Sequence, residues 1–305
     1  MTEAIVPANL PSDADVGTAG ATTQKKGFLR LFIERNKVGM VGYVVFFAIV
    51  VMAFVGPLLL PDSNPTDVAK VYQPPSWEHP LGTDFAGKDV LYQVVNGGSG
   101  LLIVSSMAAL MSTLIAVVFG ALAGLLGGRF DSVTLMITDV VLTVPSIILL
   151  GVLAVFVRLD NILLLAVILA VFGWPTLLRA VRAQVLSLKE REYVEAARML
   201  DLPLRYVLFR EVLPNMMPYI VINFVLAMTG AIYAQVILYY LGLVPLQGDN
   251  WGLMIQQAYT KGAMFYKDSF VYLMAPMVMI ILLQLSLVMI SRTLEDVFNP
   301  RLREV

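Results

Sequence analysis

The segment 81–89, LGTDFAGKD, has the residue types and part of the spacing of a phosphate-binding loop. Gly82 and Gly87 stand five positions apart and Lys88 follows directly, as in loops whose backbone N–H groups and lysine hold phosphate oxygens. Asp89, however, occupies the position of the hydroxyl side chain that binds Mg²⁺, and its carboxylate would repel a phosphate. Whether the segment can meet ATP depends on the elements around it and on the side of a membrane on which it lies.

The composition of the chain indicates an all-α integral membrane protein. Of 305 residues, 58% are hydrophobic and 14% are charged, against about 25% charged residues in a soluble domain. Long apolar runs without strict alternation favour membrane helices and exclude membrane strands. We predict six spans, at about residues 38–60, 99–127, 133–157, 161–181, 215–241 and 271–291.

Residue counts exclude several kinds of chemistry. The chain has no cysteine and one histidine, His79, so neither a disulfide nor a Cys/His metal cage can form. We expect no metal in this chain and interpret His79 as a loop residue that forms hydrogen bonds. The net charge of −1 gives no electrostatic support for the binding of nucleic acid.

Lysine and arginine orient the predicted spans. Sixteen of these 21 residues would lie on the side of the two termini and the 182–214 loop, and five on the other side. The positive-inside rule then places both termini and that loop in the cytoplasm. The 61–98 loop lies outside, where there is no ATP, so we reject the nucleotide site in LGTDFAGKD and expect any ATPase to be another chain.

The region before the first span has two parts. Residues 1–24 are small, polar and acidic and lack the basic start of a signal peptide, which predicts a disordered cytoplasmic tail. Residues 25–37, KKGFLRLFIERNK, fit a short interfacial helix or, equally well, a basic flank that orients the first span. Residues 38–305 are then the transmembrane domain.

The charged segment 187–215 is predicted to form two cytoplasmic helices. Ser187 and Glu190 have the spacing of a capping box and predict the start of the first helix. A second short helix, at about 204–213, leads to Pro214 in the first turn of the fifth span.

One side of the first cytoplasmic helix is suited to contact another protein. The side consists of Tyr193, Ala196, Ala197 and Leu200. Two adjacent alanines let another backbone come close, and a helix joined to two spans can transmit force to them. The alternative is a passive helix beside the membrane.

The segment 192–215, EYVEAARMLDLPLRYVLFREVLPN, resembles the cytoplasmic signature of ABC-transporter permease subunits. The match rests on Glu195-Ala196-Ala197 and on Leu213-Pro214. The resemblance implies that the first helix docks in a cleft of an ATPase subunit and couples nucleotide binding to the spans. Its candidate coupling residues are Tyr193, Glu195, Ala196, Ala197, Leu200, Asp201, Leu213 and Pro214.

Asp201 departs from the pattern of these permeases. It stands four residues after the second alanine, where the family has glycine. A glycine at that point ends a helix in the left-handed conformation, which aspartate tolerates better than most residues. The sequence therefore predicts a left-handed turn at Asp201.

Further segments narrow the resemblance to the dipeptide and oligopeptide permeases, and to the second of their two permease subunits. In chain order these segments are RNKVGMVGYVV (35–45), HPLGTDFAGKDVL (79–91, with Lys88 for the usual arginine), RFDSVTLMITDVVLTVPSIIL (129–149), YYLGLVPLQGDNWGLMIQQA (239–258) and DVFNPRLRE (296–304). They are collinear over about residues 30–305. The resemblance implies the permease fold of type I ABC importers in a multi-pass protein of a prokaryotic inner membrane.

The resemblance also implies partners and a role. The partners are a homologous second permease, two ATPase subunits, an extracytoplasmic substrate-binding protein and membrane lipid. The chain itself is expected to be no enzyme and to hold no cofactor, with ATP and Mg²⁺ bound by the ATPases. The implied substrates are di- and oligopeptides, and oligosaccharides are the alternative. A stand-alone secondary transporter or channel is the rival class, and it predicts internal repeats and several deep charges.

A few polar residues lie inside the predicted spans. Asp139 and Gln235 are candidates for the translocation path, or for pairing of helices. Asn223 and Gln284 allow the same two interpretations, and we favour a structural role for both. Gly120, Gly124 and Gly128 have the spacing of close helix packing.

The outer segment 242–270 is rich in aromatic and polar side chains, among them Trp251, Tyr259 and Phe265. It is predicted to fold over the outer mouth or to contact the binding protein. An ordinary interfacial aromatic belt is the alternative.

Overall fold

The computed structural model describes residues 37–61, 63–157, 159, 161–244 and 248–298. All the predicted spans belong to one unit of the chain, Val38–Val305. The predicted tail (1–24) lies outside the described residues, as does the predicted interfacial helix (25–37) apart from Lys37.

The described residues form helices and no strand. In chain order the α-helices are α2 (Lys37–Val55), α3 (Val90–Leu126), α4 (Gly128–Thr143), α5 (Ser146–Phe156), α6 (Ile162–Lys189), α7 (Glu192–Met199), α8 (Leu204–Tyr206), α9 (Leu213–Tyr240), α10 (Trp251–Thr260) and α11 (Phe270–Phe298). A 3₁₀ turn, η1 (Gly56–Leu59), extends α2, and a π-helical turn, η3 (Val207–Val212), joins α8 to α9.

Five of the described helices are long and apolar enough to cross a membrane, and the pair α4–α5 makes a sixth span if it is counted as one. The number of predicted spans is thus confirmed in that sense. The straight third span predicted at 133–157 is wrong, because α4 and α5 meet at a bend of 80°. Pro145 causes the break: it has no N–H to donate, and it holds Val144 in an extended conformation (φ −99°, ψ 130°).

Two helix boundaries also differ from the prediction. The helix α3 begins at Val90 rather than near 99, because the carboxylate of Asp89 accepts a hydrogen bond from the N–H of Tyr92 and caps it. The predicted helix start at Ser187 is wrong, since Ser187 lies inside α6, which continues to Lys189. Val185 and Leu188 are buried there, and their packing keeps the helix intact past Ser187.

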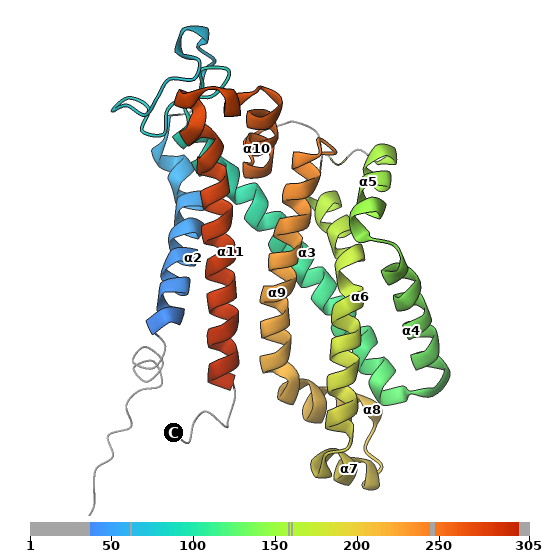
Figure 1. The fold of residues 1–305 in the computed structure, drawn as a ribbon. Coiled ribbons are helices and arrows are strands. Elements are labelled where there is room, and N and C mark those ends of the chain that lie inside the picture. The colour runs from blue at the N-terminus through green and yellow to red at the C-terminus, as the bar shows by residue number, and fades with distance from the viewer. Residues whose placement is uncertain (1–36, 62, 158, 160, 245–247, 299–305) are drawn as a thin grey trace, which may run out of the picture. The chain divides into compact units, whose positions relative to one another are not determined.

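The centre of the fold is the crossing of α3 and α6, with α9 packed against both (Figure 1). Gly120 and Gly124 make the crossing possible. A Cβ atom on Gly120 would lie 2.9 Å from the carbonyl oxygen of Leu178, and one on Gly124 would lie 2.8 Å from a methyl group of Val185. The predicted close packing is confirmed for these two glycines, whereas Gly128 has no such neighbour and begins α4.

The helix α10 was not predicted. Trp251 at its start is fully buried, and its indole N–H donates to the carbonyl of Val94 in α3 at 2.7 Å. Gly97 and Gly98 leave room for this indole ring, because a Cβ atom on either would lie 3.0 Å from it. Trp251 therefore belongs to the core and to neither an aromatic belt nor a docking surface, while Phe265 is exposed.

Candidate functional site

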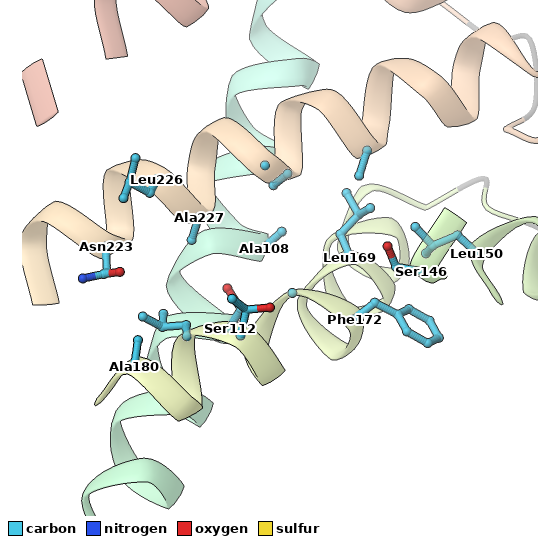
Figure 2. A pocket seen from close by; sticks show the side chains of 16 residues that line it. Ala108, Ser112, Ser146, Leu150, Leu169, Phe172, Ala180, Asn223, Leu226 and Ala227 are labelled. Carbon is cyan, nitrogen blue, oxygen red and sulfur yellow. The ribbon is translucent and has the colours of Figure 1, made fainter. Parts of the chain in front are cut away.

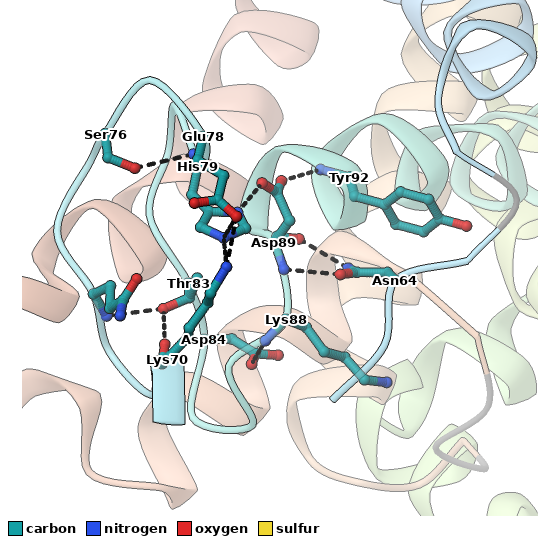
Figure 3. Close-up of polar contacts among 11 residues, drawn as sticks. Asn64, Lys70, Ser76, Glu78, His79, Thr83, Asp84, Lys88, Asp89 and Tyr92 are labelled. Atoms are coloured by element: carbon teal, nitrogen blue, oxygen red, sulfur yellow. Dashed lines mark hydrogen bonds and ion pairs between the residues drawn. The ribbon is translucent and has the colours of Figure 1, made fainter. Parts of the chain in front are cut away.

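The glycine-rich segment 81–89 holds a carboxylate of the chain itself (Figure 3). Asp84 is buried, and its Oδ1 accepts hydrogen bonds from the N–H groups of Ala86 (2.7 Å) and Lys88 (2.9 Å). Its Oδ2 accepts one from the side-chain amide of Gln93 at 2.7 Å. The N–H groups that would hold a phosphate are therefore already occupied, which gives the segment a structural role.

His79 lies in the same loop (Figure 3). Its Nδ1 is 2.8 Å from Oδ2 of Asp89, and its Nε2 is 3.4 Å from Nζ of Lys70. His79 thus forms hydrogen bonds in a loop, as predicted, and it braces the aspartate that caps α3. The described residues contain no group of three or more His, Cys, Asp or Glu side chains placed to hold a metal ion.

The helix α7 is attached to the membrane helices by one face. Val194 and Ala197 are buried in a cluster with Val185 of α6 and with Val207 and Val212 of η3. The opposite face is exposed and consists of Tyr193, Glu195, Ala196, Met199 and Leu200. The adjacent alanines, predicted to share one contact face, therefore have different environments, and only Ala196 is free to contact a partner.

Asp201 ends α7 as the sequence predicted. Its φ of 53° is left-handed, and the N–H of Leu202 donates to the carbonyl of Ala197 at 3.2 Å. This pairing is the six-to-one bond of a Schellman cap, which satisfies a carbonyl at the helix end. Aspartate therefore adopts the left-handed turn that the sequence predicted at this position.

The chain from α8 to α9 forms one helical rod rather than the predicted separate helix at 204–213. Helical structure is continuous over Leu204–Tyr240. Pro214 has no N–H to donate to the carbonyl four residues earlier, and the π-helical pairing of the preceding turn, with the N–H of Leu213 on the carbonyl of Leu208, fits this loss. Leu213 is partly buried and Pro214 is exposed. The helix α7 is therefore connected to α6 through a short turn and to α9 through this rod.

A cavity of about 410 Å³, here called the central cavity, lies between α3, α5, α6 and α9 (Figure 2). Its wall is largely alanine, glycine and leucine, with polar side chains from each of the four helices: Ser112, Ser146, Thr176 and Asn223. Asn223 lines the cavity while its amide donates to the carbonyl of Tyr219 at 2.8 Å. The small residues of α9 gave no sequence signal, because such residues also pack helices together.

Asp139 does not line the central cavity. It forms an ion pair with Arg179 of α6, and both side chains are about half exposed. Asp131, which lies before Asp139 in the same helix, pairs with Arg182 of α6. A terminal nitrogen of Arg182 lies 2.5 Å from Oδ2 of Asp131. These two ion pairs fix α4 to α6.

Gln235, the second candidate for the translocation path, is buried beside another cavity. It is 1% exposed, lines a second cavity, and neither its amide nitrogen nor its amide oxygen has a hydrogen-bond partner among the described residues. Gln284, by contrast, donates to the carbonyl of Thr229 at 3.2 Å and so links α11 to α9. This bond agrees with the structural role that we favoured for Gln284.

Residues 116–304 match the family model described as the binding-protein-dependent transport system inner membrane component, and residues 28–75 match the N-terminal TM domain of oligopeptide transport permease C. The chain belongs to this family of inner membrane transport components. It is a multi-pass membrane transport subunit with the permease fold of type I ABC importers, which confirms the predicted family and fold class.

Its relatives are permeases of similar length. The chain is 32% identical to the oligopeptide transport system permease protein OppC of Bacillus subtilis, over 82% of this chain and 84% of the relative. It is 33% identical to a putative peptide permease protein of Brucella suis, over 88% of each chain. It is 34% identical to the dipeptide transport system permease protein DppC of Bacillus subtilis, over 73% of this chain and 70% of the relative.

Proposed function

We propose that this chain is one of two permease subunits of an ATP-driven importer of di- and oligopeptides, and that α7 couples it to an ATPase. The observation that carries the coupling role is the exposed face of α7. Met199 and Leu200 are 80% and 73% exposed there, although α7 is held to the spans by its other face. An apolar surface on a helix outside the spans is suited to a protein partner.

The names of the relatives support peptides as the substrate, since they are oligopeptide, dipeptide and putative peptide permeases. None of these names favours an oligosaccharide. ATP and Mg²⁺ belong to two partner ATPases in this proposal, a binding protein delivers the peptide, and a second, related permease completes the path.

The orientation in the proposal has both termini and α7 in the cytoplasm. The excess of lysine and arginine on that side supports it. Within Val38–Val305, the C-terminal end of α11 and the start of α9 lie at the same end as α7, and α10 lies at the opposite end (Figure 1). The central cavity then forms this subunit's half of the path, and motion of α7 reaches its walls through α6 and α9.

The substitution Ala196→Arg tests the coupling role. A large charged side chain on the exposed face blocks a close approach of the ATPase while leaving the buried face of α7 intact. We expect at least a tenfold loss of ATP-dependent tripeptide uptake by the complete importer in liposomes. This factor corresponds to a loss of about 1.4 kcal/mol or more in the free energy of coupling between α7 and the ATPase. Ala197→Arg is unsuitable, because it would place an arginine in the buried cluster.

The matched control is Ala183→Arg, which adds the same side chain at an exposed position of α6. It should retain uptake and should bind the ATPases as the unchanged chain does. Normal uptake by the Ala196→Arg importer would remove α7 from the coupling mechanism. Uptake without any ATPase would instead favour a stand-alone transporter.

A further inference from the structure

The cavity lined by Gln235, here called the polar cavity, has a volume of about 310 Å³. It lies between α3, α6, α9 and the residues directly before α10, and Gly100 and Tyr239 also contribute to its wall. An amide buried without a partner costs about 1–3 kcal/mol. An occupant of the cavity that donates to the oxygen of Gln235 and accepts from its nitrogen would remove this cost.

A carboxylate lies in the same wall. Asp249 lines the polar cavity and forms no ion pair among the described residues. Burial raises the pKa of the Asp249 carboxyl above its usual value; Lys88 offsets part of the rise and Asp84 adds to it. A partly desolvated carboxylate that forms no ion pair is stabilised further by a cation that enters the cavity.

The two helix starts at the polar cavity do not call for an anion. Asn161 begins α6 and Asn250 begins α10, and both line the cavity. The side-chain oxygen of Asn161 accepts from the N–H of Leu163 at 2.7 Å, and that of Asn250 accepts from the N–H of Gly252 at 2.9 Å. Each helix start is thus capped by its own side chain, and the charged group of the wall is the carboxylate.

We propose that the polar cavity binds the amino-terminal end of a peptide, with the ammonium group at Asp249 and the oxygen of Gln235, and the first peptide carbonyl at the nitrogen of Gln235. The inference rests on the proposed function and names the part of the substrate that this chain recognises. The volume is at the lower end of the range of small-molecule sites, which suits one or two residues rather than a whole oligopeptide.

The chemistry of Gln235 distinguishes a peptide from an inorganic cation. Its side chain needs both a donor and an acceptor. A bare cation such as K⁺ satisfies the oxygen and leaves the nitrogen unpaired. The ammonium and the first carbonyl of a peptide stand two bonds apart on one residue and satisfy both atoms, and every peptide with a free amino terminus carries them whatever its side chains.

Equilibrium binding to the purified importer complex in lipid nanodiscs, without the binding protein, tests this assignment. The probes are tri-alanine and N-acetyl-tri-alanine, which lacks the ammonium. We expect tri-alanine to bind at least about tenfold more tightly, because a charge-assisted hydrogen bond contributes about 1.5–3 kcal/mol. Asp249→Asn should remove this preference, and Gln235→Leu should weaken tri-alanine binding by a similar factor.

The matched control is Asp268→Asn, the same change at an exposed aspartate between α10 and α11. It should bind both probes as the unchanged complex does. Equal binding of the two peptides, or an unchanged preference in Asp249→Asn, would overturn the proposal, and so would a site that K⁺ occupies with no preference between the peptides. Failure of the proposed function is a separate result: no ATP-dependent uptake of any peptide by the complete importer.

Discussion

Asp84 determines at the residue scale what the glycine-rich segment does. Its carboxylate accepts three hydrogen bonds, from Ala86, Lys88 and Gln93, and is buried while doing so. Gly87 passes so close to Asp67 that a Cβ atom there would lie 1.8 Å from its carbonyl oxygen. The glycines thus serve a tight turn around a carboxylate, and this turn positions the first residues of α3.

The substitution Asp84→Ala tests this role. It leaves two backbone N–H groups and one side-chain amide without their acceptor, at a cost of about 1–3 kcal/mol for each group that water cannot reach. We expect a Tm several degrees lower in thermal unfolding of the detergent-solubilised protein, following the usual relation between stability and Tm. Asp268→Ala, at an exposed aspartate, is the control, and equal Tm values for the two variants would contradict the assignment.

Part of the role of the glycine-rich segment 81–89 could be predicted from the sequence. The aspartate at the hydroxyl position and the side of the membrane were enough to reject a nucleotide site. The sequence did not indicate that the carboxylate of Asp84 occupies the loop. Its partner beyond the turn is Gln93, which lies inside a helix predicted to start only near residue 99. For the same reason the cap formed by Asp89 was missed.

At the element scale, the end of α7 was predicted correctly and its faces were not. The left-handed turn at Asp201 is a local property of the chain, so a sequence pattern can indicate it. The burial of Ala197 depends on Val207 and Val212, which reach it only after the chain turns back at that point. The break at Pro145 was available from the sequence, because proline excludes the preceding residue from helical geometry, but the apolar run concealed it.

The substitution Asp201→Gly tests the turn that ends α7. Glycine adopts a φ of 53° at less cost than aspartate. We expect the variant to be as stable as the unchanged chain or more stable by up to about 1 kcal/mol, with uptake retained. Asp201→Val should lower stability by more than about 1 kcal/mol, because a β-branched side chain is strained there. Thermal unfolding of the three chains compares them, and a destabilised glycine variant would contradict the cap.

At the scale of the whole described unit, α3, α6 and α9 form the walls of both cavities, and α6 and α9 also reach α7. The family and the number of spans followed from the sequence, because apolar length and collinear motifs are properties of the chain alone. The cavities did not, since residues from helices far apart in sequence line them. The exposed apolar faces of α2 and α11 are suited to lipid.

Labelling of single cysteines tests the central cavity, and the native chain offers no competing thiol. Thr176→Cys places a thiol in the wall of that cavity, and Leu285→Cys places one on an exposed apolar face of α11. We expect a water-soluble maleimide to label position 176 at a rate that changes with the nucleotide bound to the ATPases, and to leave position 285 unlabelled in a membrane. Equal labelling of both positions would exclude a water-accessible path at Thr176.

Pro175 is buried near the middle of α6 and has no N–H for the carbonyl of Val171. Because this hydrogen bond is already missing, bending α6 at Pro175 costs less free energy than bending it elsewhere. One arm of α6 then carries Asn161 and the wall of the polar cavity, and the other carries Arg182 and the connection to α7. In the proposed cycle, the two ends of this helix can tilt in different steps, and a substrate contact at one end can be released while the other end still follows the ATPase.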